Sequence, residues 1–477
     1  MKFNFKISNY LFWIFIAIIV KGLFFWSNVY LNYDETKPLL GYFTHDSGEY
    51  YDSMNSLYET GNYSPDIRMP GLGIIFLFFR IFFEKKIVLN IILILQWLVS
   101  GLAIYTLALT ISRVTKKERV FYFVFFLFLF THFIFLWNNF LLSESLCMSF
   151  FIFAIYYLNR FLMYDKRKYL FLAGLFFTWC VFIRPVFLLF YGIAAIFLLV
   201  YFIRERKSVK SIFINGILFL VLFCIFDTSW IARNLIVKNK FKYLNDIDWY
   251  SKLSASSPDP ALYFFLESWG GDLENERHWF EIDYKIDYEY RDTIIPDRIY
   301  TTQFNKDSLI LVKKRIQIFK AHPSDSIVAL INSSLMNFTE SIKNEKPFTF
   351  YIGSGMIFMK RLIFSGYFPY NVFDENFQRL PIIIKIAKLT KAVLFYILFF
   401  IGMVYALLLL SWKQKNYVLL MLIVIAFSNL IYIAFFFKTP EFRYVLPSTI
   451  VFFCLTAILA EKAWDRIRTR ISSAKQQ

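Results

Sequence analysis

The amino-acid sequence predicts an all-α polytopic membrane protein with an extracytoplasmic α/β-type domain. Of its 477 residues, 58% are hydrophobic, which exceeds the roughly 45–50% of a soluble domain. Aromatic residues make up 22% and charged residues only 18%. The sequence also contains long apolar runs that are separated by basic turns. Together these observations exclude a water-soluble globule, a disordered chain and a coiled coil.

The apolar runs predict the membrane-spanning helices. Crossing a hydrocarbon core of about 30 Å takes about 20 mostly apolar helical residues, and about ten segments fit this length. They are 11–31, 87–111, 120–136, 140–163, 169–183, 186–203, 212–231, 392–410, 417–437 and 445–460. A further apolar stretch, 71–83, is too short to span and is expected to lie at the interface or to re-enter the membrane.

The basic residues predict the orientation, because short turns rich in Lys and Arg stay in the cytoplasm. If the N-terminus is cytoplasmic, the larger basic set falls on the cytoplasmic side: Lys2, Lys6, Arg113, Lys116, Lys117, Arg119, Lys166, Arg167, Lys168, Arg204, Arg206, Lys207, Lys210, Lys413, Lys415, Lys462, Arg466, Arg468, Arg470 and Lys475. The smaller set on the other side is Lys37, Arg68, Arg80, Lys85, Lys86, Arg184, Lys438 and Arg443. We therefore predict that both termini are cytoplasmic and that 11–31 is a retained signal anchor.

Two long segments then lie outside the cytoplasm. The first outer loop covers 32–86. The second segment, 232–391, contains Pro, Asp, Glu, Asn and Ser in the proportions of a soluble protein. The predicted organisation is an N-terminal transmembrane domain (1–231), an extracytoplasmic domain (232–391) and C-terminal transmembrane helices with a cytoplasmic tail (392–477).

The formal net charge of +17 would suggest a nucleic-acid partner in a soluble protein. Here the basic residues lie mostly in turns between apolar runs, so the charge indicates membrane orientation and predicts no nucleic-acid partner. All four cysteines, Cys147, Cys180, Cys224 and Cys454, fall inside apolar runs. We therefore expect neither a disulfide nor a zinc framework.

The first outer loop holds the densest group of candidate functional residues, within THDSGEYYDSMNSLYETGNYSPDIRMPGLG. In a helix over 46–58, Asp46 and Glu49 share one face. Two interpretations remain open for these carboxylates. Asp46 or Ser47 would cap the helix with Glu49 as capping-box partner, or the carboxylates would carry chemistry.

Further charged residues are predicted on the same side of the membrane. Glu144 begins the fourth span, where a carboxylate is costly unless it faces protein or water, so it is either functional or a snorkelling interface residue. Arg184, Arg233 and Arg443 would each be explained as a headgroup-level anchor. Their occurrence beside three carboxylates on one side of the membrane favours a site.

Carboxylates and arginines at an outer lipid–water boundary suit transfer from a lipid phosphate to a hydroxyl. One carboxylate would accept the acceptor proton, and guanidinium groups would hold the departing phosphate. The sequence contains no P-loop, dinucleotide fingerprint, HExxH or GxSxG motif. Its four histidines are too scattered to predict a metal site.

These residues, in this order, resemble the GT-C superfamily of polyprenyl-phosphate-sugar-dependent glycosyltransferases. The resemblance is to the group that contains protein O-mannosyltransferases and lipid A aminoarabinose transferases. Its motifs match Asp46, Tyr50, Gly61 and Arg68-Met69-Pro70-Gly71 in the first loop, then Ser143-Glu144, Arg184-Pro185, Trp230 with Arg233-Asn234, and Arg443-Tyr444 with Pro447. The family commonly has more late helices than the three found here.

The resemblance implies a GT-C fold, the roles of individual residues and a location. Asp46 would be the catalytic base, with Glu49 and Glu144 as further catalytic candidates. The implied substrate-binding residues are Tyr50, Arg68, Arg184, Arg233, Asn234, Arg443 and Tyr444. A divalent metal is left open, because Ser47 stands where the family often has a second acid. The implied location is the bacterial inner (plasma) membrane, with an extracytoplasmic active site.

The function predicted on this basis is an integral-membrane inverting glycosyltransferase. It would transfer sugar from a polyprenyl-phosphate donor to a glycan, glycolipid or protein hydroxyl, with the lipid bilayer as a further partner. One alternative is a transporter or flippase of lipid-linked sugars, which would place polar residues near mid-bilayer in broken helices. The other is a polymerase or ligase that uses a lipid-diphosphate donor.

The predicted orientation can be tested with cysteines introduced near Asn275 and near Lys117. In intact cells, a membrane-impermeant thiol reagent should label the first position and spare the second. Labelling of the second position alone would reverse the orientation, and with it the assignment of the site to the outer face.

Overall fold

The computed structural model describes residues 10–32, 39–63, 68–131, 135–239, 241, 243–244, 257–271, 280, 296–364, 380–411, 416–439 and 441–474. This part of the chain is helical. Its only strand-like pairing is an isolated parallel bridge between Tyr42 and Phe140. The α-helices are α1 (Tyr10–Asn32), α2 (His45–Thr60), α3 (Gly71–Arg80), α4 (Lys85–Thr115), α5 (Glu118–Phe130), α6 (Glu144–Tyr164), α7 (Arg167–Ile183), α8 (Phe187–Arg204), α9 (Val209–Lys238), α10 (Asp259–Trp269), α12 (Lys306–Ala321), α13 (Asp325–Glu345), α14 (Ser354–Phe364), α16 (Ile382–Ser411), α17 (Tyr417–Ile431) and α18 (Leu446–Ala474).

The helices confirm a polytopic membrane protein. Among the described residues, 8 helices are long and apolar enough to cross a membrane. They correspond to eight of the ten predicted spans. The predicted third and fifth spans form α5, with 13 residues, and α7, with 17 residues. These two helices are therefore shorter than the about 20 residues that a full crossing takes.

The chain divides into two compact units. Unit 1 comprises 1–245, 393–427 and 446–477, and unit 2 comprises 246–392 and 428–445. Each unit is described by itself. The sequence-based division at 231 and 391 concerns sides of the membrane and stays a prediction.

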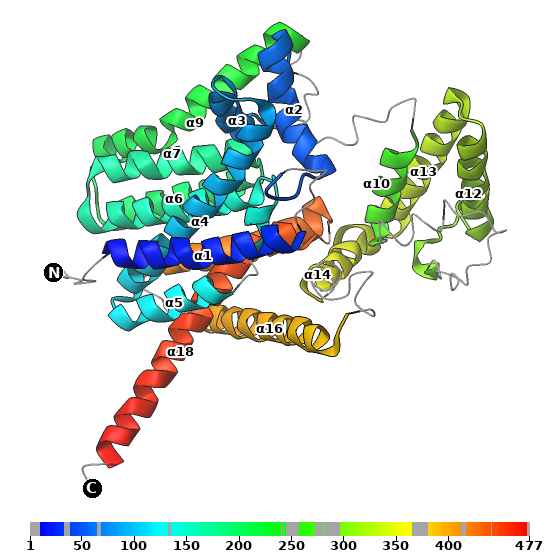
Figure 1. Ribbon diagram of the computed structural model, residues 1–477. Coiled ribbons are helices and arrows are strands. Elements are labelled where there is room, and N and C mark those ends of the chain that lie inside the picture. The colour runs from blue at the N-terminus through cyan, green and yellow to red at the C-terminus, as the bar shows by residue number, and fades with distance from the viewer. Residues whose placement is uncertain are drawn as a thin grey trace. The chain divides into compact units, whose positions relative to one another are not determined.

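Unit 1 is organised around α4, which packs against α1, α5 and α6, while α7 packs between α6 and α9 (Figure 1). Next to the N-terminal half of α4, an apolar cluster joins α2, α3 and the start of α6. Tyr51, Phe76 and Ile92 in this cluster are fully buried. Burying a large apolar side chain contributes about 1.5–3 kcal/mol, so this cluster fixes the short helices α2 and α3 on the bundle.

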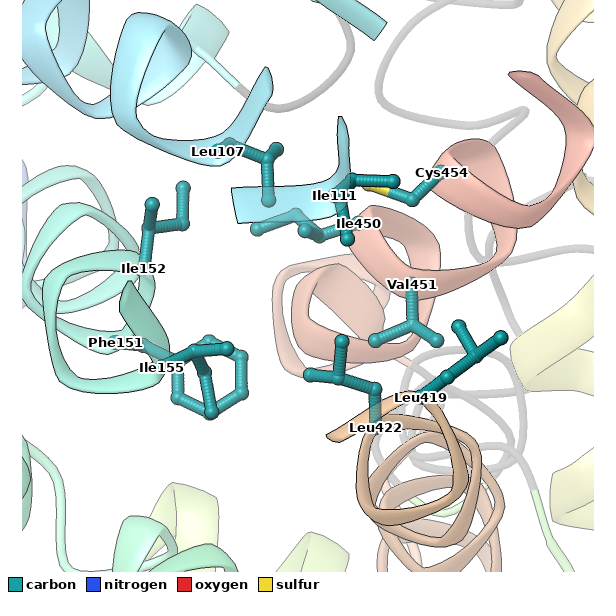
Figure 2. Close-up of a pocket in the computed structure, with 10 residues that line it drawn as sticks. All are labelled: Leu107, Ile111, Phe151, Ile152, Ile155, Leu419, Leu422, Ile450, Val451 and Cys454. Carbon is teal, nitrogen blue, oxygen red and sulfur yellow. The ribbon is translucent and has the colours of Figure 1, made fainter. Parts of the chain in front are cut away.

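A small apolar cavity lies deeper in unit 1, between α4, α6, α17 and α18 (Figure 2). Its walls carry no charged group. The lining residues are Leu107, Ile111, Phe151, Ile152, Ile155, Leu419, Leu422, Ile450, Val451 and Cys454. The cavity therefore offers no carboxylate, histidine or lysine for acid–base chemistry.

Unit 2 has its own apolar core, in which α10 and α12 pack against α13. Phe265, Trp269 and Phe338 are buried at its centre. The predicted α/β character of the outer domain differs from what is found, because its described residues are helical and contain no strand. Mixed polar and apolar composition is compatible with amphipathic helices such as α13 as well as with strands.

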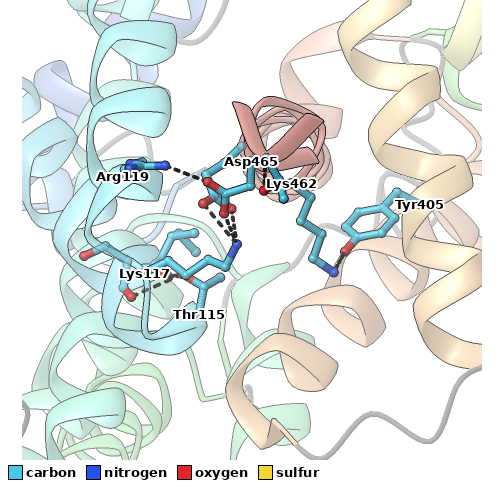
Figure 3. A network of polar contacts seen from close by, with 10 residues as sticks. Thr115, Lys117, Arg119, Tyr405, Lys462 and Asp465 are labelled. Atoms are coloured by element: carbon cyan, nitrogen blue, oxygen red, sulfur yellow. Dashed lines mark hydrogen bonds and ion pairs between the residues drawn. The ribbon is translucent and has the colours of Figure 1, made fainter. Parts of the chain in front are cut away.

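A polar network ties the turn between α4 and α5 to the middle of α18 (Figure 3). Lys117 Nζ donates to Glu461 Oε2 at 2.7 Å and to Asp465 Oδ2 at 2.9 Å. Arg119 Nη1 also contacts Asp465, at 2.6 Å. The Glu461 side chain is only 2% exposed, so this carboxylate depends on its partner for compensation.

Replacing this carboxylate should weaken the bundle. Because charged hydrogen bonds contribute about 1.5–3 kcal/mol, Glu461→Gln is expected to lower the free energy of unfolding by about that amount. Thermal unfolding of the purified protein in detergent would measure the loss. Glu205→Gln is the control, since Glu205 is exposed and surface substitutions usually change stability by less than about 0.5 kcal/mol. Equal melting temperatures for the two variants would contradict a stabilising role of the network.

Candidate active site

Helix α2 begins at a cap that does not use its acidic residues. Thr44 is the N-cap and forms a capping box with Ser47, whose Oγ accepts from Thr44 N–H at 2.9 Å. The interpretation of Asp46 or Ser47 as N-cap, with Glu49 as partner, is therefore wrong. Thr44, two residues before Asp46, caps the helix instead, so the carboxylates of Asp46 and Glu49 are not needed for its start.

Instead, both carboxylates face Arg68 from the segment that follows α2. Arg68 Nη2 lies 2.6 Å from Glu49 Oε2 and 3.7 Å from Asp46 Oδ1. The Arg68 guanidinium also lies over the Tyr50 ring, 5.3 Å from its centroid. Burial lowers the pKa of Arg68, but the nearby Tyr50 and Glu49, with Asp46, outweigh this and leave the pKa raised. Arg68 is thus held charged on one face of α2.

A second ion pair joins the start of α6 to the end of α7. Arg184 follows the last residue of α7 and donates through Nη1 to Glu144 Oε1 at 2.5 Å. The two side chains are only 9% and 2% exposed. Ser143 Oγ contacts Glu144 Oε2 at 3.4 Å and the Tyr50 hydroxyl at 3.0 Å. The buried pair is therefore linked to α2 through Tyr50.

Close backbone packing positions the Arg68 segment against this pair. A Cβ atom on Gly71 would lie 2.5 Å from the carbonyl carbon and oxygen of Phe182, two residues before Arg184. A real Cβ atom does not approach backbone so closely, so only glycine lets the start of α3 contact the end of α7 here. The glycine of the motif is explained by this contact.

Arg233 reaches the same region from α9. Its Nη1 donates to Asn234 Oδ1 at 2.9 Å, and its guanidinium lies over the rings of Trp230 and Tyr63, 5.0 and 5.3 Å from their centroids. The Tyr63 hydroxyl donates to the backbone oxygen of Arg68 at 2.8 Å. Contacts therefore run from Arg233 to the first loop.

Sequence reasoning did not single out Tyr63. The residue lies between Gly61, which ends α2 with φ 76, and the RMPG motif. An aromatic residue in a short polar connection between two candidate motifs is the signal that could have found it.

Arg443 and Tyr444 belong to unit 2, in the short helix Phe442–Val445. Arg443 pairs with Glu441, and its guanidinium lies over the Tyr444 ring at 5.4 Å from the centroid. The Tyr444 backbone oxygen accepts from Asn429 at 3.0 Å. Convergence of Arg443 with Arg184 and Arg233 on one pocket stays a prediction.

The residues described here do not form a cluster of three or more His, Cys, Asp or Glu side chains suited to a metal ion. Arg68 contacts the carboxylates of both Asp46 and Glu49. The family resemblance does not decide whether the protein requires a divalent metal, and this requirement stays untested.

Comparison with known proteins bears on this arrangement. Residues 69–245 match the model of the Alg9-like mannosyltransferase family. This match supports a membrane glycosyltransferase of the GT-C superfamily. It covers less than half of the chain and includes Glu144, Arg184 and Arg233. The specific subgroup of the sequence resemblance is left open.

No curated protein matches the chain. Among solved structures, the chain is similar to the archaeal oligosaccharyltransferase AglB from Archaeoglobus fulgidus, in complex with an inhibitory peptide and a dolichol-phosphate, with a TM-score of 0.47 and 12% identity. The similarity covers 99% of this chain and 52% of that chain. The protein thus spans about half the length of AglB.

Glu144→Gln tests the buried pair. The substitution leaves the Arg184 guanidinium buried without its carboxylate, and breaking such a pair costs about 3–5 kcal/mol. Unfolding monitored by denaturant or heat should show this loss, and adding Arg184→Met should recover part of it. Glu59→Gln is the matched control, because Glu59 is 52% exposed in its pair with Arg80. Losses of similar size in both variants would contradict the structural importance of the Glu144–Arg184 pair.

Proposed function

We propose that the protein is an inverting glycosyltransferase of the bacterial plasma membrane that uses a polyprenyl-phosphate sugar. The acceptor is an extracytoplasmic hydroxyl of a glycan, glycolipid or protein. The observation that carries this proposal is the Asp46–Arg68–Glu49 group, which lies in a contact network with Glu144–Arg184 and with Arg233. The match to a mannosyltransferase family supports the reaction class.

Asp46 is the proposed base. Its side chain is 27% exposed, compared with 13% for Glu49 and 2% for Glu144. Asp46 also lies farther from Arg68 than Glu49 does. Among the three candidate carboxylates, Asp46 is therefore the one that an acceptor hydroxyl reaches most readily.

Glu49 and Glu144 then serve as positioning residues. Glu49 holds the Arg68 guanidinium through contacts of 2.6 Å from both Nε and Nη2. Glu144 holds Arg184 at the end of α7. Loss of either carboxylate would change where an arginine lies rather than remove the base.

The reaction is a single displacement at the anomeric carbon. The acceptor oxygen forms a bond to this carbon while its proton passes to Asp46. The bond from the carbon to the phosphate oxygen breaks, and the lipid phosphate leaves with the electron pair. One carboxylate base and no covalent intermediate account for inversion.

Arg233 is the proposed ligand of the departing phosphate. Its guanidinium lies close to the rings of Trp230 and Tyr63, which restrict the positions it can take. A planar guanidinium can bind two phosphate oxygens through parallel hydrogen bonds, which a lysine cannot do. Arg184 is less available, because its side chain is 9% exposed and bonded to Glu144.

Asp46→Asn tests the proposal. The substitution removes the basic lone pair but keeps the size of the side chain, and Thr44 still caps α2. Because a general base contributes about 10²–10⁴ in rate, turnover should fall at least about a hundredfold while donor binding and thermal stability are retained. The assay follows loss of labelled sugar from a panel of polyprenyl-monophosphate and polyprenyl-diphosphate donors in membranes that contain the protein.

Asp52→Asn is the matched control on the same helix, because Asp52 is 46% exposed and pairs with Lys85. This variant should transfer sugar at the wild-type rate. Full activity of Asp46→Asn would remove Asp46 as the base. Transfer only from diphosphate donors would favour the polymerase or ligase, and sugar-lipid movement without transfer would favour a flippase.

A further inference from the structure

Unit 2 carries an unusual helical segment directly after α13. The π-helix Thr349–Gly353 continues into α14 (Ser354–Phe364), so the backbone runs through 349–364 without a break. One side of this segment is buried, through Ser354, Gly355, Phe358 and Leu362. The segment is therefore anchored to its unit along one face.

The opposite side exposes large apolar side chains. Phe348 is 66% exposed, Tyr351 56%, Ile352 44% and Met356 59%. Their spacing of three and four residues places them along one face of the helix. Contiguous exposed apolar groups of this kind mark an interaction surface rather than an ordinary solvated face. We call Phe348, Tyr351, Ile352 and Met356 the α14 apolar face.

The buried side of α14 packs on the end of a membrane-spanning helix. The candidate span Tyr417–Phe437 ends in the π-helix Tyr432–Phe437, and α14 contacts this π-helix within unit 2. A Cβ atom on Gly355 would lie 2.2 Å from the Phe435 ring. Lys438, just after the span, donates to the Phe350 backbone oxygen at 3.2 Å. These contacts place α14 at the depth where the span leaves the hydrocarbon.

The charges near the face fit a lipid surface. Lys360 is exposed one turn after Met356. Basic side chains beside an apolar helical face are typical of helices that lie in the membrane interface, where the apolar face is buried about 5–10 Å into the boundary of headgroups and acyl chains. Long basic side chains reach from this depth to headgroup phosphates.

We propose that 348–364 is an interfacial membrane helix whose α14 apolar face contacts the lipid leaflet next to the end of α17. The partner is the bilayer itself, through acyl chains at the apolar face and anionic headgroups at Lys360. Unit 2 is thereby fastened to the membrane surface by a contact in addition to the spans through which the chain enters and leaves it. This inference does not depend on the proposed enzymatic reaction.

Site-specific quenching tests the proposal on the full-length protein in lipid nanodiscs. A fluorophore is attached to Ile352→Cys or Met356→Cys in a Cys224→Ser background, because Cys224 is exposed while the other cysteines are buried. Leu330→Cys is the matched control: Leu330 is 51% exposed on a different helix of the same unit, α13. Quenching is measured with spin-labelled phospholipids and with aqueous iodide.

The expected result is strong quenching by spin-labelled lipid and weak quenching by iodide at positions 352 and 356, with the reverse at position 330. Three results would overturn the proposal. Iodide quenching at all positions would mean that the face is solvated. Protection from both quenchers would mean that protein covers it. Cross-linking of 352 between two chains, without lipid quenching, would make it a dimer surface.

Discussion

The buried ion pair between Glu144 and Arg184 is the constraint on which the site depends. Both side chains are almost fully buried among apolar helices, where a single unpaired charge would be very costly. The pair therefore fixes the start of α6 against the end of α7. Through Ser143 and Tyr50 it also fixes α2, and α2 carries the carboxylates that face Arg68. Removing either partner of the pair would therefore alter the position of Asp46, although Glu144 and Asp46 belong to different helices.

Hydropathy predicted the membrane helices well, because crossing a bilayer imposes a minimum length on each apolar run. It overstated the third span, because α5 ends at Phe130, six residues before the predicted end, whereas α7 ends at Ile183 as predicted. A long apolar run indicates that a segment is buried in lipid or protein. Where its helix ends depends on the backbone conformation of the C-cap residue, which is Thr131 for α5 and Arg184 for α7. The outer domain could not be assigned from composition, because amphipathic helices and strands draw on similar residues.

The sequence predicted which residues belong to the site but not which of them contact one another. Motif order brought Asp46, Glu49, Arg68, Glu144, Arg184 and Arg233 into consideration, and contacts within unit 1 connect them. Which carboxylate each arginine contacts depends on how α2, α3 and α7 pack. The local sequence does not determine this packing. The same limit explains the mistaken cap: Asp and Ser are better capping residues by type than Thr, yet the path of the preceding chain makes Thr44 the N-cap.

The charge balance of the network has a consequence for turnover. Asp46, Glu49 and Glu144 are matched in number by Arg68, Arg184 and Arg233. Before any substrate binds, these six side chains together carry no formal net charge. After sugar transfer Asp46 holds the acceptor proton on the proposed mechanism, so the group carries one net positive charge beside a lipid phosphate with two negative charges. Loss of that proton returns the group to neutrality and weakens its hold on the phosphate. On the proposed function, such a site discharges its spent carrier lipid easily, so that the carrier can be recycled.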